Sequence, residues 1–343
     1  MVSGTEASGR RPSMADVGRA AHVSAQTVSR YHTGGYVSPD ARKRIERAVR
    51  DLGYQHSRLP GILRSQHTDT LGFITMGPLN FGNTGILAGV NRAARDEGQQ
   101  LLTAQLDLDP SAPSSTADIR RTLQSLTSMR VDGIVVGTPY IGVEALLDEA
   151  GSVPVVSLSE RAPDGIDTVH ADSYGAARLG VRHLVELGHR RIVHLAGPDD
   201  RNEASERVRG YLDELAAHRL APLPVEACAE WDADSGAAAA RRVDPTSFTA
   251  VASGNDEIAL GFMSVMHERG LRAPDDYSIV GIDDMPEAKY FTPALTSARL
   301  DFEALGEAAL RLVLDRIRGT SVVQERVLPS VLAVRASTAE RTR

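Results

Sequence analysis

The sequence predicts a small all-α head followed by a larger α/β body built from two doubly wound parallel sheets. Residues 13–56 contain helix start and stop signals, whereas from about residue 69 short apolar runs alternate with helical patterns. Charge divides at the same place: residues 10–66 hold eleven Arg or Lys and four Asp or Glu, a net +7, in a chain of net −7. The remainder therefore carries −14, which indicates different partners for the two parts.

Three short helices are expected in the head, because a serine suited to the N-cap position precedes each of them. These serines are Ser13, Ser24 and Ser38. Asp16 stands three residues after the first, as in a capping box, and Pro39 occupies the first helical position after the third. The second helix is predicted over residues 25–32. The third runs to residue 52, where Gly53 can take the left-handed position that ends a helix.

The three helices are expected to share one small core. Its predicted members are Val17, Ala21, Val23, Val28, Ile45, Val49 and Leu52. Residues 20–23 form a tight turn between the first two helices. Two helices joined in this way are a helix-turn-helix, whose second helix enters the major groove of DNA. The positive charge of the head agrees with a nucleic-acid partner.

The second helix, SAQTVSRYH, has side chains that can contact base edges. Gln26 can hydrogen-bond bidentately to an adenine edge, and Ala25 and Thr27 offer methyl contact or a hydroxyl. Three further residues suit phosphates or base edges: Ser24, Ser29 and Arg30. The alternative is a solvated helical bundle without a nucleic-acid role, but the caps, the turn and the polar helix face all favour a DNA reader.

Motifs along the whole chain follow the order and spacing of one family. The head contains DV, AxxVSxQTVSR, GYVSPDARKRI and LGY. The body contains HLVELGHRRIVHLAGP, NDEIALG, DDYSIVGIDDMP, YFTPALTS and VLPSVLAVRAST. The chain therefore resembles the lactose-repressor (LacI/GalR) family of transcriptional regulators over nearly its whole length.

The resemblance implies a DNA-induced hinge over residues 57–68. In the family this segment becomes a short helix on operator DNA and inserts a leucine into the minor groove, and Leu63 is the matching residue. Such a wedge unstacks a base step and kinks the duplex. Ser57 and Arg64 are expected to contact DNA beside it. The alternative for Leu63 is packing within a linker.

Three residues depart from the family pattern. Pro60 falls in the first turn of the expected hinge helix, where proline is tolerated, but Gly61 costs about 1 kcal/mol relative to alanine. Hinge folding is therefore expected to be weaker or altered. His22 stands where the turn often has glycine, and a positive φ is uncommon for histidine.

The body predicts parallel sheets covered by helices on both faces. Strands are expected over residues 71–76, 100–106, 133–137, 153–158, 191–197, 248–254 and 277–283. Helices are expected over residues 86–97, 118–129, 143–150, 174–187, 203–218, 234–242 and 257–269. About 275 residues exceed one comfortable core, so two subdomains are predicted, with a ligand cleft beyond the carboxyl ends of their strands.

The resemblance gives the expected domain boundaries, because the family's sensor is similar to periplasmic sugar-binding proteins and crosses between subdomains three times. The crossings are expected near Ala171, Ser297 and Arg326. Residues 1–12 form an N-terminal extension and 13–56 the head. The N-terminal subdomain comprises residues 69–170 and 298–326, and the C-terminal subdomain comprises residues 171–297 and 327–343.

Five residues are candidate effector ligands. Asp283 ends a predicted strand and Asn255 follows another; a carboxylate can accept from vicinal hydroxyls, and an amide both donates and accepts. The resemblance adds Arg207 as an effector-holding arginine, Trp231 as an aromatic over a sugar face, and Phe302 as a pocket wall. Each has a structural alternative: helix caps for Asn255 and Asp283, a surface salt bridge for Arg207, and packing for the two aromatic residues.

Several features leave the ligand open. Ser159 and Glu160 stand where many family members have an aspartate, and Arg207 would equally suit a carboxylate or phosphate. Asp284 is expected to be a cap or turn residue. An inducing sugar is the first expectation. A corepressor or activating mode with a nucleobase or phosphorylated metabolite is the second.

Other function classes find little support in the sequence. It lacks GxGxxG, GxxxxGK[ST], HExxH and GxSxG motifs, and Cys228 is the single cysteine, so no enzyme, metal site or cofactor is expected. A hydrolase using Asp283 or Asp284 has no supporting motif. Residues 1–12 lack a signal-peptide core. This lack counts against an exported solute-binding protein and favours a cytoplasmic location. No heptad tail follows Thr338, so a homodimer on a palindromic operator is expected.

Overall fold

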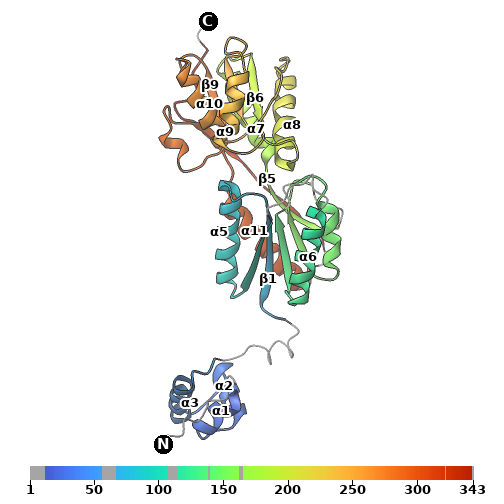
Figure 1. The fold of residues 1–343 in the computed structure, drawn as a ribbon, viewed down its shortest axis with the longest axis vertical. Coiled ribbons are helices and arrows are strands. Elements are labelled where there is room, and N and C mark those ends of the chain that lie inside the picture. Colours follow the sequence, from blue (N-terminus) through green and yellow to red (C-terminus); the bar gives the residue numbers. More distant parts are fainter. Residues whose placement is uncertain are drawn as a thin grey trace, which may run out of the picture. The chain divides into compact units, whose positions relative to one another are not determined.

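The computed structural model describes residues 12–55, 67–106, 114–137, 140–161, 165–320 and 322–341. The chain forms two compact units, Met1–His67 and Thr68–Arg343 (Figure 1). The predicted hinge residues Ser57, Leu63 and Arg64, together with Pro60 and Gly61, lie outside the described residues.

The first unit contains the three predicted helices, α1 (Met14–Ala20), α2 (Ala25–His32) and α3 (Pro39–Leu52). Each serine cap is in place. Ser13 and Asp16 form a reciprocal capping box, in which the backbone N–H of Ser13 donates to the Asp16 carboxylate at 2.7 Å. Gly53 ends α3 at φ 60°. The helix starts and stops predicted from the sequence are therefore confirmed for α2 and α3.

The core of this unit differs from the prediction at the end of α3. Val17, Ala21, Val28 and Ile45 are buried, and Val23 and Val49 pack partly against them. Leu52, however, is 37% exposed, so its assignment to the core is wrong. It is the last residue of α3. Four residues that the prediction omitted complete the core instead: Val37, Ala41, Ala48 and Tyr54.

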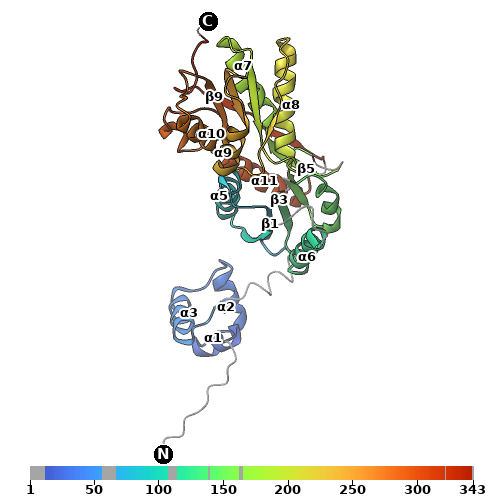
Figure 2. The same ribbon diagram turned by 45° about the horizontal axis from the view of Figure 1, so that its top comes forward.

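The second unit contains two six-stranded sheets (Figures 1 and 2). The first has the order β11-β5-β4-β3-β1-β2 and is parallel throughout. Its strands are β1 (Thr70–Met76), β2 (Gln100–Leu106), β3 (Gly133–Gly137), β4 (Val155–Leu158), β5 (Asp167–Ala171) and β11 (Glu325–Leu328). The second has the order β12-β10-β9-β8-β6-β7, with only β12 antiparallel among the paired strands. Its strands are β6 (Ile192–Ala196), β7 (Glu226–Ala227), β8 (Ala250–Ser253), β9 (Ser278–Asp283), β10 (Thr296–Arg299) and β12 (Val331–Ala333).

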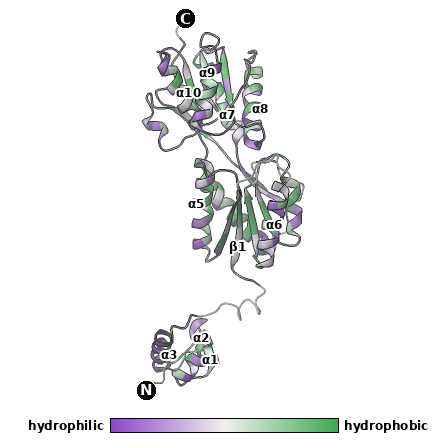
Figure 3. Ribbon diagram, viewed as in Figure 1, coloured by the Kyte–Doolittle hydropathy of each residue, from purple (hydrophilic) through white to green (hydrophobic). Residues whose placement is uncertain are grey.

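Helices cover both faces of each sheet, because apolar side chains of the strands point both ways. In the first sheet Leu71 and Phe73 pack toward α5 (Phe81–Asp96) and α11 (Phe302–Ile317), whereas Ile74 and Met76 pack toward α6 (Ser114–Ser128) and the 3-10 helix η1 (Glu144–Ala150). In the second sheet α9 (Ala233–Arg242) and α10 (Asp256–Glu268) cover one face; α7 (Ser173–Glu186) and α8 (Asn202–Ala217) cover the other. Figure 3 shows apolar strands between helices with polar outer surfaces.

The chain passes between the two sheets three times. It leaves the first sheet after β5 for α7, returns after β10 to α11, and leaves again after β11 for β12. Residues of both subdomains share one apolar cluster at these passages, including Ile282, Ala298 and Leu300 with the core of the first sheet. The residue boundaries of the domains given above stay predictions.

Glycines bring the helices of two covering pairs, α5–α11 and α9–α10, into backbone contact. A Cβ on Gly89 of α5 would lie 2.0 Å from the Glu303 carbonyl oxygen of α11, and one on Gly261 of α10 would lie 1.7 Å from the Ala233 carbonyl oxygen of α9. Larger side chains would force these helices apart. Each pair is therefore packed as one rigid layer.

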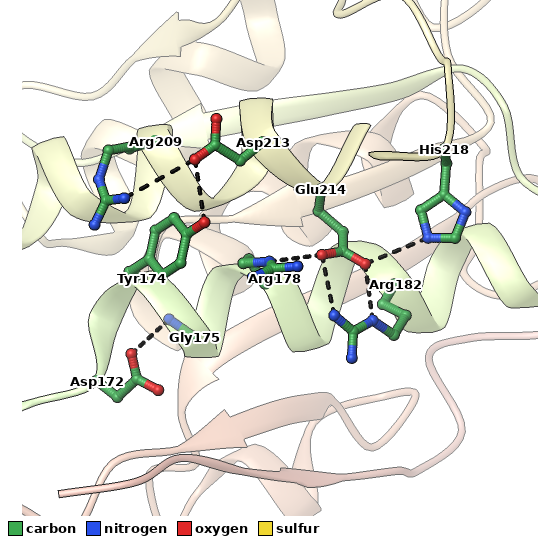
Figure 4. A network of polar contacts seen from close by, with 9 residues as sticks. All are labelled: Asp172, Tyr174, Gly175, Arg178, Arg182, Arg209, Asp213, Glu214 and His218. Carbon is green, nitrogen blue, oxygen red and sulfur yellow. Dashed lines mark hydrogen bonds and ion pairs between the residues drawn. The ribbon is translucent and has the colours of Figure 1, made fainter. Parts of the chain in front are cut away.

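A buried carboxylate joins α7 to α8 on the outer face of the second subdomain (Figure 4). Glu214 is 1% exposed and accepts hydrogen bonds from Arg178 at 2.7 Å and Arg182 at 2.8 Å, with His218 at 3.3 Å. Burial alone would raise the pKa of Glu214, but the two guanidinium groups lower it to about 2. The network therefore needs the ionised carboxylate.

Several body elements differ from the sequence prediction. The segment predicted as a helix over 143–150 is the 3-10 helix η1, and α5 begins at Phe81 because Asn80 caps it. Strands β5, β7, β10, β11 and β12 were not predicted. Their sequences are short or rich in polar residues, and β5 begins with Asp167. That buried carboxylate accepts two hydrogen bonds of 2.7 Å from Arg316 and one of 2.7 Å from the Gln324 backbone N–H.

Candidate functional site

The first candidate surface is α2 of the helical unit. Ala25, Gln26 and Arg30 are exposed on it, and Ser29 is half-buried. Among the described residues the Gln26 amide makes no hydrogen bond, so it is available to an external partner. The hydroxyls of Ser24 and Thr27 lie 2.9 Å apart, and Ser24 also accepts from the Thr27 backbone at 3.1 Å. The cap thus fixes the start of the exposed face.

The turn before α2 places His22 at a positive φ. His22 has φ 55°, the left-handed region that glycine usually occupies. A Cβ on Gly18 of α1 would lie 2.8 Å from the Val23 carbonyl oxygen. The turn is therefore tight on both sides, and His22 adopts a backbone conformation that favours glycine.

The second candidate site is a cavity between the carboxyl ends of the two sheets. About 120 Å³ of its interior is open to the centres of water molecules, so it holds several waters at once. That is space for a ligand with a single ring. All five residues predicted from the sequence line it: Arg207, Trp231, Asn255, Asp283 and Phe302.

Arg207 is the buried cation of the cavity. It is 4% exposed; its Nη1 donates to the Gly254 carbonyl oxygen at 2.6 Å and its Nη2 to Asp283 Oδ1 at 3.3 Å. The guanidinium lies 4.8 Å from the centre of the Trp231 ring, a cation–π distance. Its buried Nε finds no hydrogen-bond partner among the described residues. Arg207 is thus partly engaged within the protein and is not a surface residue.

Asp283 occupies an unusual backbone conformation at the end of β9. Its φ is 107°, a conformation strongly disfavoured for residues other than glycine, and Asp284 follows at φ 54°. Burial raises the pKa of Asp283 to about 7, against the opposing charge of Arg207. The Asp283 carboxylate therefore lies in the cavity wall and does not cap a helix.

The predicted cap or turn role of Asp284 holds only in part. It stands in the positive-φ turn, but its carboxylate forms ion pairs, with Arg335 at 2.6 Å and Arg299 at 3.0 Å. Asp256 also supports the turn, accepting from Met285 N at 2.8 Å and Ser297 Oγ at 2.6 Å. Burial and the nearby Asp283 hold the pKa of Asp256 well above its usual range. These contacts fix the strained turn from behind.

Trp231 lies flat against backbone. A Cβ on Gly197 would lie 2.0 Å from its ring, and one on Gly254 would lie 3.2 Å away. Asn255 donates to the Trp231 carbonyl oxygen at 3.1 Å and accepts from Ile258 N at 2.8 Å, so it caps α10 while lining the cavity. Both interpretations of Asn255 are therefore compatible with the structure.

Phe302 forms an apolar wall at the first position of α11. Its ring meets Phe81 edge to face, with centroids 5.8 Å apart, and Gly82 and Gly85 of α5 leave room for it. Cavity and core interpretations of Phe302 both hold, since it lines the cavity and packs against the first subdomain. Together with Trp231 it gives the cavity two aromatic surfaces.

Contacts cross the cleft at one edge of the cavity. Asn202 Nδ2 donates to Ser159 Oγ at 3.0 Å, and Arg201 places its guanidinium 3.8 Å from the centre of the Tyr140 ring. The backbone N–H of Ile141 donates to the Asp200 carbonyl oxygen at 3.0 Å. These bonds join the loops after β3 and β4 to the start of α8, and they hold the two subdomains together on this side.

The sequence did not predict three residues with a carboxyl or hydroxyl group that line the cavity, and a fourth was noted there without a ligand role. Glu203, Glu257 and Ser173 line it, as does Glu160, which the sequence singled out only as a departure. Burial raises the pKa of Glu160 to about 7; a hydrogen bond from Ser173 opposes this rise. Burial also raises the pKa of Glu203. A signal was present, since Glu203 precedes Arg207 by four residues and thus shares its helix face.

Residues 13–57 match the family described as "Bacterial regulatory proteins, lacI family", and residues 181–338 match a periplasmic binding protein-like domain. The HTH-type transcriptional regulator AscG of Escherichia coli (strain K12) is 32% identical over 310 residues, which cover 88% of this chain and 90% of AscG. The chain belongs to the lacI family. The resemblance inferred from its motifs is thereby confirmed.

Solved structures resemble this LacI-family regulator along nearly its whole length. A lac repressor dimer bound to operator and the anti-inducer ONPF aligns with a TM-score of 0.86 and 28% identity, covering 96% of this chain and 100% of that one. A complex of the transcriptional regulator CelR with cellobiose aligns with a TM-score of 0.70 and 30% identity, covering 95% and 100%. The predicted fold class is confirmed.

The described part of the LacI-family regulator shows neither a cluster of metal-ligating side chains nor a membrane-spanning helix. In the described ranges no three His, Cys, Asp or Glu side chains gather as metal ligands would. None of the helices described is long and apolar enough to cross a membrane.

Proposed function

We propose that this LacI-family regulator represses transcription as a homodimer on a two-fold symmetric operator and leaves it when its cleft binds a small effector. One observation carries the proposal. Five residues singled out from the sequence, four on the second subdomain and Phe302 on the first, line a single cavity at the carboxyl ends of both sheets. A ligand there contacts both subdomains, so its binding changes the relative free energies of their open and closed arrangements.

The helical unit supplies the DNA contacts in this proposal. Gln26, exposed on α2, reads an adenine edge in the major groove, while Ser24, Ala25, Thr27, Ser29 and Arg30 contact neighbouring bases or phosphates. Two copies are needed, because each α2 occupies one half of a symmetric operator. The related lac repressor dimer bound to operator supports that stoichiometry. The hinge residues Ser57, Leu63 and Arg64 act at the centre of the site.

The effector is a polyol of the sugar class. Trp231 and Phe302 offer ring faces to C–H groups, and Asp283 and Asn255 offer hydrogen bonds to hydroxyls. The cellobiose complex of the related CelR supports a sugar. A phosphorylated ligand fits less well, since Arg207 already binds Asp283 and Gly254. The regulator performs no catalytic step in this proposal and acts in the cytoplasm, where it meets chromosomal DNA.

Binding to DNA fragments from the neighbourhood of its own gene tests the proposal. Electrophoretic mobility is measured at a stated salt concentration, with and without a panel of hexoses, hexosamines, nucleobases and sugar phosphates. Specific binding that one sugar-class compound releases is the expected result. Binding that appears only with a ligand would establish corepression instead. No fragment bound specifically would overturn the DNA-binding role.

A further inference from the structure

The wall of the cavity carries more negative than positive charge. Among its described lining residues are four carboxylates, Glu160, Glu203, Glu257 and Asp283, but only one arginine, Arg207. Arg207 is paired with Asp283. In the described part of the chain the other three carboxylates form no ion pair. Within the described residues, three of the four carboxyl groups of the cavity therefore lack an ion-pair partner before any ligand enters.

Two of these carboxylates lie on opposite walls and close to one another. The hydrogen bond of 3.0 Å between Ser159 and Asn202 crosses the cleft, and Glu160 and Glu203 are the residues that directly follow these two. Both line the cavity, and each repels the negative charge of the other. A group lying beside the cross-cleft contact is thus within reach of a carboxylate from each subdomain.

The existing contacts of the pair leave room for more. Glu160 lies beside the Ser173 hydroxyl, and Glu203 lies beside the Trp231 indole. An ionised carboxylate has about four acceptor positions, so each can accept further hydrogen bonds. Neither of these neighbours carries a charge. Arg207 is engaged with Gly254 and Asp283, and His170, which also lines the cavity, is paired with Glu325. Hydrogen-bonding capacity is therefore available, and a positive charge beside the pair would favour the ionised form that burial disfavours.

The chemistry of the bound group follows from desolvation. Closing the cleft on a neutral ligand would remove water from two carboxylates without supplying a countercharge, which is costly. An ammonium group supplies three donors and a positive charge at once. An anionic ligand would add to the repulsion.

We propose that the effector is a single-ring polyol with a protonated amine, held by Glu160 and Glu203 across the cleft while Trp231 contacts its ring. This inference rests on the proposed function, since it names the ligand class of the same cavity. Binding in this mode joins the subdomains through one charged group. Amine recognition and cleft closure are then the same event.

Matched sets of sugars test the proposal by isothermal titration calorimetry on the full-length chain. The probes are glucosamine, galactosamine and mannosamine, each compared with its parent hexose and its neutral N-acetyl derivative. One amine is expected to bind about 10- to 100-fold more tightly than both of its neutral partners, the worth of one charge-assisted hydrogen bond to a buried acceptor. Equal or weaker binding of every amine, including no binding, overturns the proposal.

Variants connect the preference to the two carboxylates. The double variant Glu160→Gln/Glu203→Gln is expected to lose most of the preference for the amine, and each single variant part of it. Glu186→Gln, which changes an exposed carboxylate at the end of α7, is the matched control and should keep it. Thermal unfolding of each variant verifies that it is folded. If the double variant is not folded, the single variants test the proposal instead. A preference for the amine that survives in these carboxylate variants overturns the proposal.

Operator binding without ligand is measured on the same preparations. A neutral hexose that releases the operator more effectively than its amine would refute the amine proposal and leave the repressor function intact. Absence of specific DNA binding would refute the repressor function whatever the sugars do. The two failures are therefore distinguishable.

Discussion

Replacing Gly197 with alanine tests how closely the Trp231 indole packs on the backbone beneath it. The new Cβ would lie 2.0, 2.3 and 2.5 Å from three ring carbons, whereas ordinary contacts begin at 3.4 Å. The ring must therefore withdraw by about 1.4 Å. Arg207 lies over the ring and Gly254 lies beside it, so withdrawal disturbs the cavity.

The expected cost is that of overpacking a well-filled site, about 1–3 kcal/mol in the free energy of unfolding. Urea denaturation followed by circular dichroism measures it. Trp231 is the only tryptophan, so its fluorescence reports the cavity without background from other indoles. We expect Gly197→Ala to shift the emission to longer wavelength, because the displaced ring meets more water. Effector affinity should fall in parallel.

Trp231→Phe provides the control, because the smaller ring lacks the atoms that the new methyl would meet. In that background Gly197→Ala should cost less than about 1 kcal/mol, so the two substitutions should be coupled in a double-mutant cycle. The packing argument is refuted if Gly197→Ala costs under about 0.5 kcal/mol with unchanged emission. Equal costs in both backgrounds would refute it as well.

Three further predictions concern the DNA-binding helix, the cavity and the α7–α8 network. Gln26→Ala should lower the ratio of specific to non-specific DNA affinity about 5- to 150-fold, the worth of one bidentate base contact; a mobility-shift assay that shows equal loss on all sequences would contradict base reading. Asp283→Ala should weaken effector binding at least about tenfold while the operator is still bound, since a charged acceptor is lost; calorimetry and mobility shifts measure both, and a normal response would remove Asp283 from the site. The pKa of Glu214 is lowered from 4.5 to about 2, so its ionised form stabilises the fold above about pH 4.5 and that contribution, up to about 3 kcal/mol, disappears as the pH falls toward 2. In urea unfolding the stability difference between the parent chain and Glu214→Gln should accordingly shrink between pH 6 and pH 3, and a difference independent of pH would exclude the ionised network.

Local signals in the sequence were sufficient for the helical unit and for most of the sheets. Ser24, Ser38 and Gly53 determine helix ends through bonds to residues within five positions, so the sequence contains what is needed to place them. Leu52 was misplaced because its exposure depends on where the last turn of α3 lies relative to the core. That relation is tertiary, and no local pattern encodes it.

Strand β5 and the acidic cavity could not be predicted for a similar reason. Asp167 makes β5 look polar, and a buried carboxylate in this strand is explained by its bonds to Arg316 and to the Gln324 backbone, both far along the chain. Glu160 and Glu203 are unremarkable as single residues. Their significance arises when the bond between Ser159 and Asn202 brings the two subdomains together. The five effector candidates were found because strand ends and family motifs could place them.

The backbone at Asp283 has a consequence for how this protein can evolve. A residue with a side chain at φ 107° stores free energy of about 1–3 kcal/mol that glycine would release. Selection for thermal stability alone would therefore favour glycine at this position, at the expense of the carboxylate in the cavity wall. Retention of aspartate in a library selected for ligand response, compared with one selected for stability alone, would measure how strongly ligand response constrains the sequence.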